Sequence, residues 1–179
     1  TTNFATGNHF YLANDVELTA GGSIKTDTTI AKVCLHLNGK RVKLLGNILL
    51  QGGTLNLLGD GQVDFQGNGG KAIEHSVLFY SPSGAEKKIH IYGGTYTSST
   101  GKQMLLGSGG NYTVNMIVKL YGNTKLDGLV TLNQSQLHLF GSATVERIEG
   151  SNTASIRADG NWNGSATVKY FTEYPGPYV

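Results

Sequence analysis

Acidic side chains are the first candidates for chemistry in this 179-residue chain. A pair of carboxylates about 5–10 Å apart can hydrolyse a glycosidic bond, and Ca²⁺ is held by about six to eight oxygen ligands. The acidic residues that come under consideration are Asp60 and Asp64, Glu146 and Glu149, and the isolated Asp127 and Asp159. They form no D-x-D-x-D cluster, and two glutamates near a turn are typical of a solvated surface. With no G-x-S-x-G, H-E-x-x-H or P-loop motif present, we expect no catalytic residues, no metal site and no cofactor.

Aromatic residues followed directly by glycine are the second set of candidates. An aromatic ring can pack against the C–H groups of a sugar, and a basic side chain beside it can bind hydroxyl or carboxylate groups. The candidate binding residues are Tyr92, Tyr121 and Phe140, each with a basic residue two positions earlier: His90, Lys119 and His138. These six side chains can act together only if the fold brings three distant segments side by side.

The segments that carry these residues are copies of one short phrase. The copies read LHLNG at 35–39, LNLLG at 55–59, IHIYG at 89–93, VKLYG at 118–122, LHLFG at 137–141 and, more weakly, SIRADG at 155–160. Their final glycines are 20, 34, 29, 19 and 19 residues apart. The basic repeat is therefore about 19–20 residues, and two intervals are longer, with the additional residues at 71–88 and 102–116.

Each phrase alternates apolar and polar residues, which is the period of a β-strand. A repeat of this length, made of short strands and glycine turns, predicts an all-β solenoid of about six coils, in which stacked coils bury a common core. A leucine-rich repeat is not favoured, because its asparagine signature and helical half are missing. An antiparallel sandwich stays open, although its strands need no fixed phrase.

Composition limits the domain count and the partners. We expect a single domain over 1–179, with an N-terminal cap and first coil at 1–30 and a C-terminal cap or linker at 170–179. The net charge of +2 and the absence of long basic runs argue against nucleic-acid binding. No stretch approaches the apolar length of about 18 residues that a membrane span needs. The single cysteine, Cys34, lies among apolar residues and is expected to be a small buried side chain. The chain has no initiator Met or signal-like segment, so we expect a mature product or a piece of a larger protein.

Alternation also predicts which side chains face inward. The expected core positions are Leu35, Leu37, Leu55, Leu57, Ile89, Ile91, Val118, Leu120, Leu137, Leu139, Ile156 and Ala158. One outward column is then His36, Asn56, His90, Lys119, His138 and Arg157, and the next is Asn38, Leu58, Tyr92, Tyr121, Phe140 and Asp159. The histidines are too widely spaced for zinc, because alternate coils lie about 10 Å apart.

The wording HFYLANDVELTAGGSIKT, followed by VCLHLNGKRVKLLG and LNLLGDGQVDFQG, resembles that of right-handed parallel β-helix modules of the pectate-lyase-like fold. The resemblance covers roughly residues 10–100. It implies a right-handed β-helix in a secreted or surface-attached bacterial protein, and that family includes polysaccharide lyases, hydrolases and adhesins. The aspartate cluster and the GHG and RIK motifs of its hydrolases are absent here.

We therefore expect a non-catalytic extracellular module of a multimodular bacterial protein, which binds carbohydrate through the aromatic and basic sheet face. An adhesive or structural spacer that contacts another protein module is the alternative, and a minimal polysaccharide lyase is the second alternative. Two other interpretations of the aromatic residues stay open: they stabilise the solenoid by stacking on one another, or the chain's own loops cover them.

Overall fold

The computed structural model describes residues 3–4, 8–18, 24–26, 32–44, 48–50, 54–65, 73–75, 87–98, 104–108, 116–133, 135–151 and 154–171. Every element in these ranges is a β-strand or a turn, and every strand pairing is parallel. The expectation of an all-β, parallel-stranded fold is confirmed, and the antiparallel sandwich is excluded for the described residues. Most of the expected C-terminal cap, at 172–179, lies outside them.

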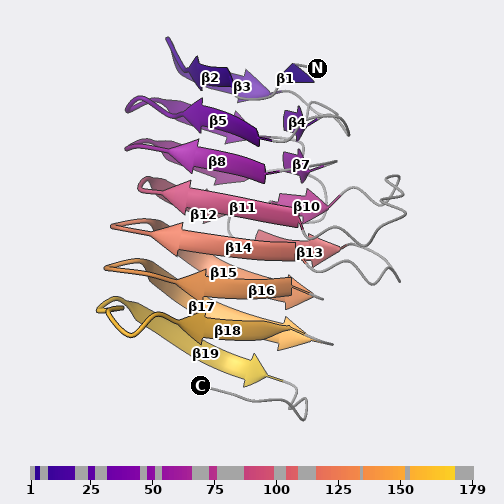
Figure 1. The fold of residues 1–179 in the computed structure, drawn as a ribbon, viewed down its shortest axis with the longest axis vertical. Helices are drawn as coiled ribbons and strands as arrows, with labels where there is room; N and C mark the ends of the chain where they lie inside the picture. The colour runs from indigo at the N-terminus through magenta and orange to yellow at the C-terminus, as the bar shows by residue number, and fades with distance from the viewer. Residues whose placement is uncertain are drawn as a thin grey trace.

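One sheet contains seven strands, one from each layer of the molecule (Figure 1). In spatial order they are β18 (Ser155–Ala158), β16 (Ser135–Leu139), β14 (Met116–Tyr121), β11 (Lys87–Tyr92), β8 (Thr54–Leu58), β5 (Lys32–His36) and β2 (Asn8–Tyr11). Six of these strands carry the six repeated phrases. The seventh, β2, adds a layer within the expected N-terminal cap.

The other sheet contains twelve strands in two rows. One row is β3 (Val16–Leu18), β6 (Arg41–Leu44), β9 (Gln62–Phe65) and β12 (Thr95–Ser98), and the other is β1 (Asn3–Phe4), β4 (Ile24–Thr26), β7 (Ile48–Leu50), β10 (Ile73–His75) and β13 (Met104–Ser108). The long strands β15 (Lys125–Asn133), β17 (Thr144–Ser151) and β19 (Ser165–Phe171) run through both rows. The first part of β15 pairs with β12 and its second part pairs with β13.

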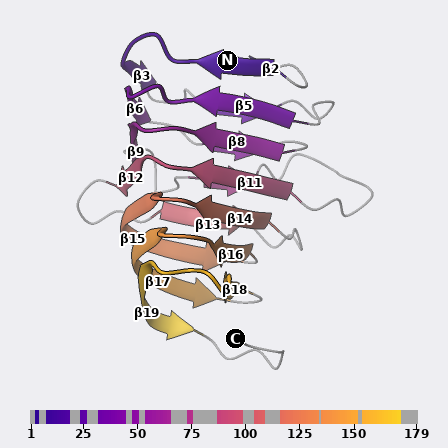
Figure 2. The same ribbon diagram turned by 60° about the vertical axis from the view of Figure 1, so that its left-hand side comes forward.

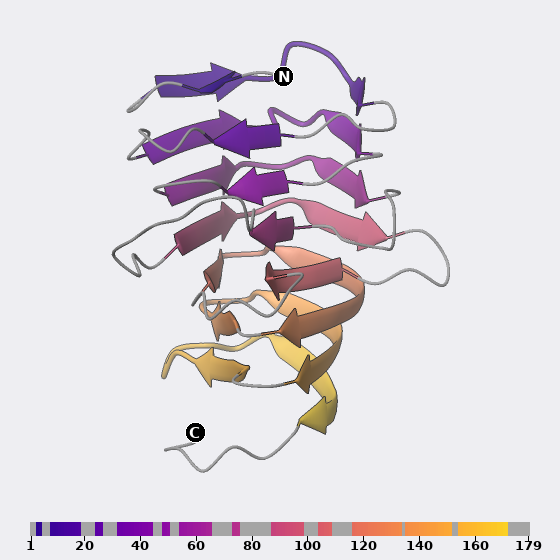
Figure 3. The same cartoon turned by 90° about the vertical axis from the view of Figure 1, so that its right-hand side faces the viewer.

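Strands pair with their counterparts one repeat earlier and one repeat later, so the chain rises layer by layer. The first strands, β1 and β2, and the last strand, β19, lie at opposite ends of the long axis (Figures 1, 2 and 3). This arrangement is consistent with a β-solenoid. Parts of both longer intervals, β10 and β13, are strands of the twelve-stranded sheet, whereas 76–86 and 109–115 lie outside the described residues.

The core is a ladder of aliphatic side chains from successive layers. Ten of the twelve positions predicted to face inward are buried: Leu35, Leu37, Leu55, Leu57, Ile89, Ile91, Val118, Leu120, Leu137 and Leu139. Ile156 is only partly buried and Ala158 is exposed, so full burial at these two positions was wrong. They belong to β18, the last strand of its sheet, which pairs on one side only.

The twelve-stranded sheet supplies a second core column that the repeat did not reveal. Its members are Val42, Val63, Tyr96, Leu126 and Val145, which are in register and buried. The strands that carry them lack the phrase, so the repeat gave no signal for this column.

The predicted register was wrong in the layer of β5. Cys34, not His36, pairs with Asn56, and His36 pairs with Leu58. Asn38 lies in the turn that follows β5, with a left-handed φ of 53°. Aligning Gly39 with Gly59 failed because Gly39 is the third residue after the end of β5, whereas Gly59 is the first residue after the end of β8.

Gly61 marks a close approach between two layers and yields a stability prediction. Its φ is +155°, and a Cβ atom there would lie 2.6 Å from Cβ of Leu37 and 2.7 Å from the carbonyl oxygen of Lys40. We expect Gly61→Ala to lower the free energy of unfolding by about 1–3 kcal/mol, which corresponds to a melting temperature lower by roughly 3–10 °C. Gly160→Ala is the control, because no atom lies within 4 Å of its Cβ position. Equal melting temperatures for the two variants would contradict the close approach.

Candidate functional site

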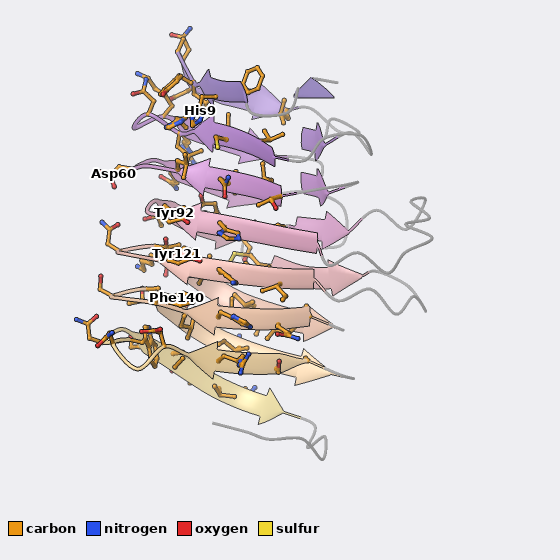
Figure 4. All side chains as sticks on the ribbon, viewed as in Figure 1. His9, Asp60, Tyr92, Tyr121 and Phe140 are labelled. Atoms are coloured by element: carbon orange, nitrogen blue, oxygen red, sulfur yellow. The ribbon has the colours of Figure 1, made fainter. Side chains whose placement is uncertain are left out.

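The three predicted aromatic residues form a stacked column at the ends of β11, β14 and β16 (Figure 4). The ring centroids of Tyr92 and Tyr121 are 4.3 Å apart with an interplanar angle of 5°, and those of Tyr121 and Phe140 are 4.7 Å apart with an angle of 11°. Parallel strands in register produce this geometry, because equivalent side chains of neighbouring strands then lie directly above one another. The structure therefore brings these three residues together as predicted.

The same column continues toward the N-terminus. Tyr11 stacks on His36 with centroids 4.1 Å apart and an interplanar angle of 14°, and Leu58 stands in register between His36 and Tyr92. We call Tyr11, His36, Leu58, Tyr92, Tyr121 and Phe140 the ring column. Tyr11 was missed in the sequence because NHFY lacks the glycine phrase.

A second column runs parallel to the ring column, two residues earlier on each strand. It comprises His9, Cys34, Asn56, His90, Lys119, His138 and Arg157, and we call it the polar column. The predicted neighbours His90, Lys119 and His138 are consecutive in it. Cys34 is buried, as expected, and accepts a hydrogen bond from Nδ2 of Asn56 at 3.4 Å.

Local contacts hold several of these side chains in place. Nδ1 of His9 lies 2.9 Å from Nε2 of His36, and Nε2 of His138 lies 3.0 Å from Oε1 of Gln136. The rings of His90 and Tyr121 have centroids 5.8 Å apart, which ties the two columns together.

Stacking decides which parts of the rings are accessible. Tyr92 is 41% exposed, whereas Tyr121 and Phe140 are half-buried. Because Tyr121 has a ring against each of its two faces, it can present only its edge and its hydroxyl group to a ligand. Burial, together with the neighbouring Tyr92, raises the pKa of the Tyr121 hydroxyl above its usual value, so this group remains a hydrogen-bond donor at neutral pH.

The twelve-stranded sheet carries a polar network on its outer face. The buried carboxylate of Asp64 accepts hydrogen bonds from Nε of Arg41 at 2.6 Å, from Nε2 of Gln62 at 2.7 Å and from Oγ1 of Thr97. Burial acts to raise the pKa of Asp64, but the hydrogen bonds from Thr97, Arg41 and Gln62 and the charge of Arg41 outweigh it and hold the pKa below its usual value. Asp64 is thus a structural carboxylate that joins three layers.

The remaining acidic candidates lie on several different elements. Asp60 lies in the turn after β8, and the carboxylate of Asp127 is paired with Nζ of Lys125 at 3.1 Å. On β17, Glu146 lies where the pairing with β19 shifts in register, and Glu149 lies directly after that irregular stretch. In the described ranges, no three His, Cys, Asp or Glu side chains are grouped closely enough to hold a metal ion.

A shallow depression of about 470 Å³ lies beside the Asp64 network. Its lining residues include Asp15, Arg41, Gln62, Thr97 and Asp127. Asp15 also accepts a hydrogen bond from the backbone N–H of Arg41 at 2.9 Å. Since Arg41 and Asp127 already have oppositely charged partners, this depression offers few unsatisfied charges to a ligand.

Comparisons with known protein families, with characterised proteins and with solved structures found no match to this chain. The described part of the chain contains no helix that is long and apolar enough to cross a membrane.

The Asp64 network gives a pH-dependent stability prediction. A carboxyl group whose pKa is depressed in the folded state stabilises the protein above its unfolded pKa of about 4, and that contribution is lost as the pH falls through the folded value. We expect Asp64→Asn to lower the unfolding free energy at pH 7 by about 1–3 kcal/mol and to flatten the decline of stability in acid. Urea unfolding from about pH 7 to about pH 3 measures both effects. Asp127→Asn, at an exposed pair, is the control; an equal loss in the two variants would argue against a special role for Asp64.

Proposed function

We propose that this chain is a non-catalytic extracellular module, built as a right-handed parallel β-helix of about six coils beyond the N-terminal layer, and that it binds carbohydrate on the outer face of the seven-stranded sheet. The observation that carries the proposal is the register of the two columns: His90, Lys119 and His138 stand beside Tyr92, Tyr121 and Phe140 over three successive strands. Right-handed connections are the strong rule for parallel strands of one sheet. The extracellular setting rests on the resemblance to β-helix modules of secreted proteins.

The mode of binding follows from which atoms are accessible. Because the rings cover one another's faces, a sugar meets their edges and the tyrosine hydroxyl groups, and the side chains of the polar column supply further donors. Strands are about 4.8 Å apart, so the three aromatic residues span about 10 Å, the length of roughly two sugar residues. A strip this short predicts binding in the micromolar to millimolar range, about 4–8 kcal/mol.

A spacer or protein-contact module is the second candidate. The face-to-face stacking at 4.3 and 4.7 Å favours it, since aromatic pairs in such contact contribute about 0.5–1.5 kcal/mol each beyond their buried area. In this alternative the ring column stabilises the solenoid and no glycan binds to it.

Replacing the central ring separates the two candidates. If the column binds carbohydrate, Tyr121→Ala abolishes binding. Its melting temperature falls only by the amount that the loss of two ring stacks explains, because an outward side chain leaves no core cavity. Affinity electrophoresis of the wild type and the variant against a panel of neutral and acidic polysaccharides tests this. Phe10→Leu, a change at a partly buried core position of a distant strand, is the control. A wild type that no polysaccharide retards would reject carbohydrate binding. If the variant then also melts several degrees lower than the wild type, the column is a structural ladder.

The non-catalytic assignment has a direct test of its own. Its support is that, among the described residues, the carboxylates of Asp64 and Asp127 form ion pairs with basic side chains of the protein. We expect no unsaturated product absorbing in the ultraviolet and no new reducing ends after incubation with pectin or alginate, with or without Ca²⁺. Either product, if absent from a heat-denatured control, would assign a lyase or hydrolase activity instead.

A further inference from the structure

The acidic residues of the strands all lie in one of the two sheets of this protein. The chain is nearly balanced, with 14 Lys and Arg against 12 Asp and Glu. The strands of the seven-stranded sheet nevertheless contain no Asp or Glu, and their basic residues are Lys32, Lys87, Lys88, Lys119, Arg157 and the histidines His9, His36, His90 and His138. The strands of the twelve-stranded sheet carry both signs of charge: Glu17, Asp64, Glu74, Asp127, Glu146 and Glu149 together with Lys25, Arg41, Lys43, Lys125, Arg147 and Lys169. The small net charge therefore hides a sheet whose strands are free of carboxylates.

The polar column places its basic side chains in direct succession. Lys119 pairs in register with His90 on one side and with His138 on the other, and His138 pairs with Arg157. His9 and His36 lie within 2.9 Å of each other near the opposite end of the same sheet. A linear anion laid across the strands thus meets a basic group on most layers.

We propose that the ligand of this face is an acidic polysaccharide, bearing carboxylate or sulfate groups, and that it binds more tightly as the pH falls below neutral. The inference rests on the proposed carbohydrate-binding function and specifies its ligand. A single-stranded nucleic acid suits the face less well, because its bases stack on exposed ring faces and both faces of Tyr121 are covered.

The pH dependence follows from the groups around each histidine. His90 faces Asn56, Lys119 and Tyr121, and its own strand adds Tyr92. His138 faces Lys119 and Arg157, with Gln136 on its own strand. His9 faces Cys34 and His36, and His36 faces His9, Tyr11 and Leu58. The described carboxylates in the connections that follow these strands, Asp15, Asp60 and Asp159, lie beyond the strand ends.

Neighbouring cations oppose protonation of these histidines, and a bound polyanion favours it. Burial and the charge of His9 already lower the pKa of His36 in the free protein. Binding of an anionic polymer therefore raises the histidine pKa values. By linkage, affinity increases as the pH falls through the ordinary histidine value of about 6.5, and it is lost as the pH rises through the value in the complex.

The test measures binding of the full chain to dextran, dextran sulfate and polygalacturonate at about pH 5.5 and about pH 7.5, at one fixed salt concentration. We expect dextran sulfate and polygalacturonate to bind roughly tenfold more tightly at the lower pH, which corresponds to a combined shift of one pKa unit. Dextran, which has no charge, should bind weakly and independently of pH.

Two variants and a control identify the face. Lys119→Gln should weaken binding of both anionic polymers at both pH values by about threefold to tenfold. The double variant His90→Gln and His138→Gln should retain binding at about pH 7.5 and lose most of the gain at about pH 5.5. Lys125→Gln, an exposed lysine of the twelve-stranded sheet, should bind like the wild type. If Lys119→Gln weakened binding of the anionic polymers no more than Lys125→Gln does, the assignment of the face would be overturned. This comparison holds even if the double variant is unstable.

The failures of the two proposals are distinguishable. Equal binding of dextran and dextran sulfate at both pH values would overturn this inference and leave carbohydrate binding standing. Binding of none of the polymers at either pH would reject both. An oligothymidylate or an anionic phospholipid vesicle that bound as tightly as the acidic polysaccharides would overturn the choice of a polysaccharide as the ligand.

Discussion

Parallel pairing of each strand with its counterpart one layer away is the constraint on which the structure depends. Such pairing holds neighbouring strands about 4.8 Å apart and places equivalent residues above one another. The residue at each position of the repeat must therefore pack against the equivalent residues of the layers above and below it. Small and medium aliphatic residues satisfy this requirement inside the molecule, and flat rings satisfy it outside, as the 4.3 Å stack of Tyr92 and Tyr121 illustrates.

The same constraint explains why much of the inward-facing pattern could be predicted from sequence and why the register of β5 could not. Leu55, Leu57, Leu137 and Leu139 recur at fixed offsets from a glycine, and alternation assigns their faces. The offset itself depends on where the glycine lies in each turn, however, and Gly39 is the third residue after β5 whereas Gly59 is the first residue after β8. A one-dimensional alignment on glycine therefore misplaced His36 by two positions, from the ring column into the polar column.

The repeated phrase also could not predict properties that depend on contacts between strands of different sequence. The role of Asp64 depends on Arg41 and Thr97, which come from the layers on either side of it. The lack of carboxylates on the strands of the seven-stranded sheet was invisible because a net charge averages over both sheets, and only the assignment of strands to sheets separates Lys119 from Asp127. Sequence reasoning succeeded for the candidate residues Tyr92, Tyr121 and Phe140 because all three follow the repeat without an insertion inside the phrase.

Stacking in register also limits how many charged side chains a column can hold. This limit explains why histidines occupy several positions of the polar column. Two like charges about 4.8 Å apart repel by about 1 kcal/mol in water and by about 3.5 kcal/mol at an effective dielectric constant of 20. A column of lysines on successive strands would therefore oppose the pairing that builds the fold. In the polar column, Lys119 is flanked by His90 and His138, and histidine, unlike lysine, is a side chain without a permanent charge. Histidine thus allows a basic column to form at low electrostatic cost and to gain charge only when an acidic medium or an anionic ligand offsets the repulsion.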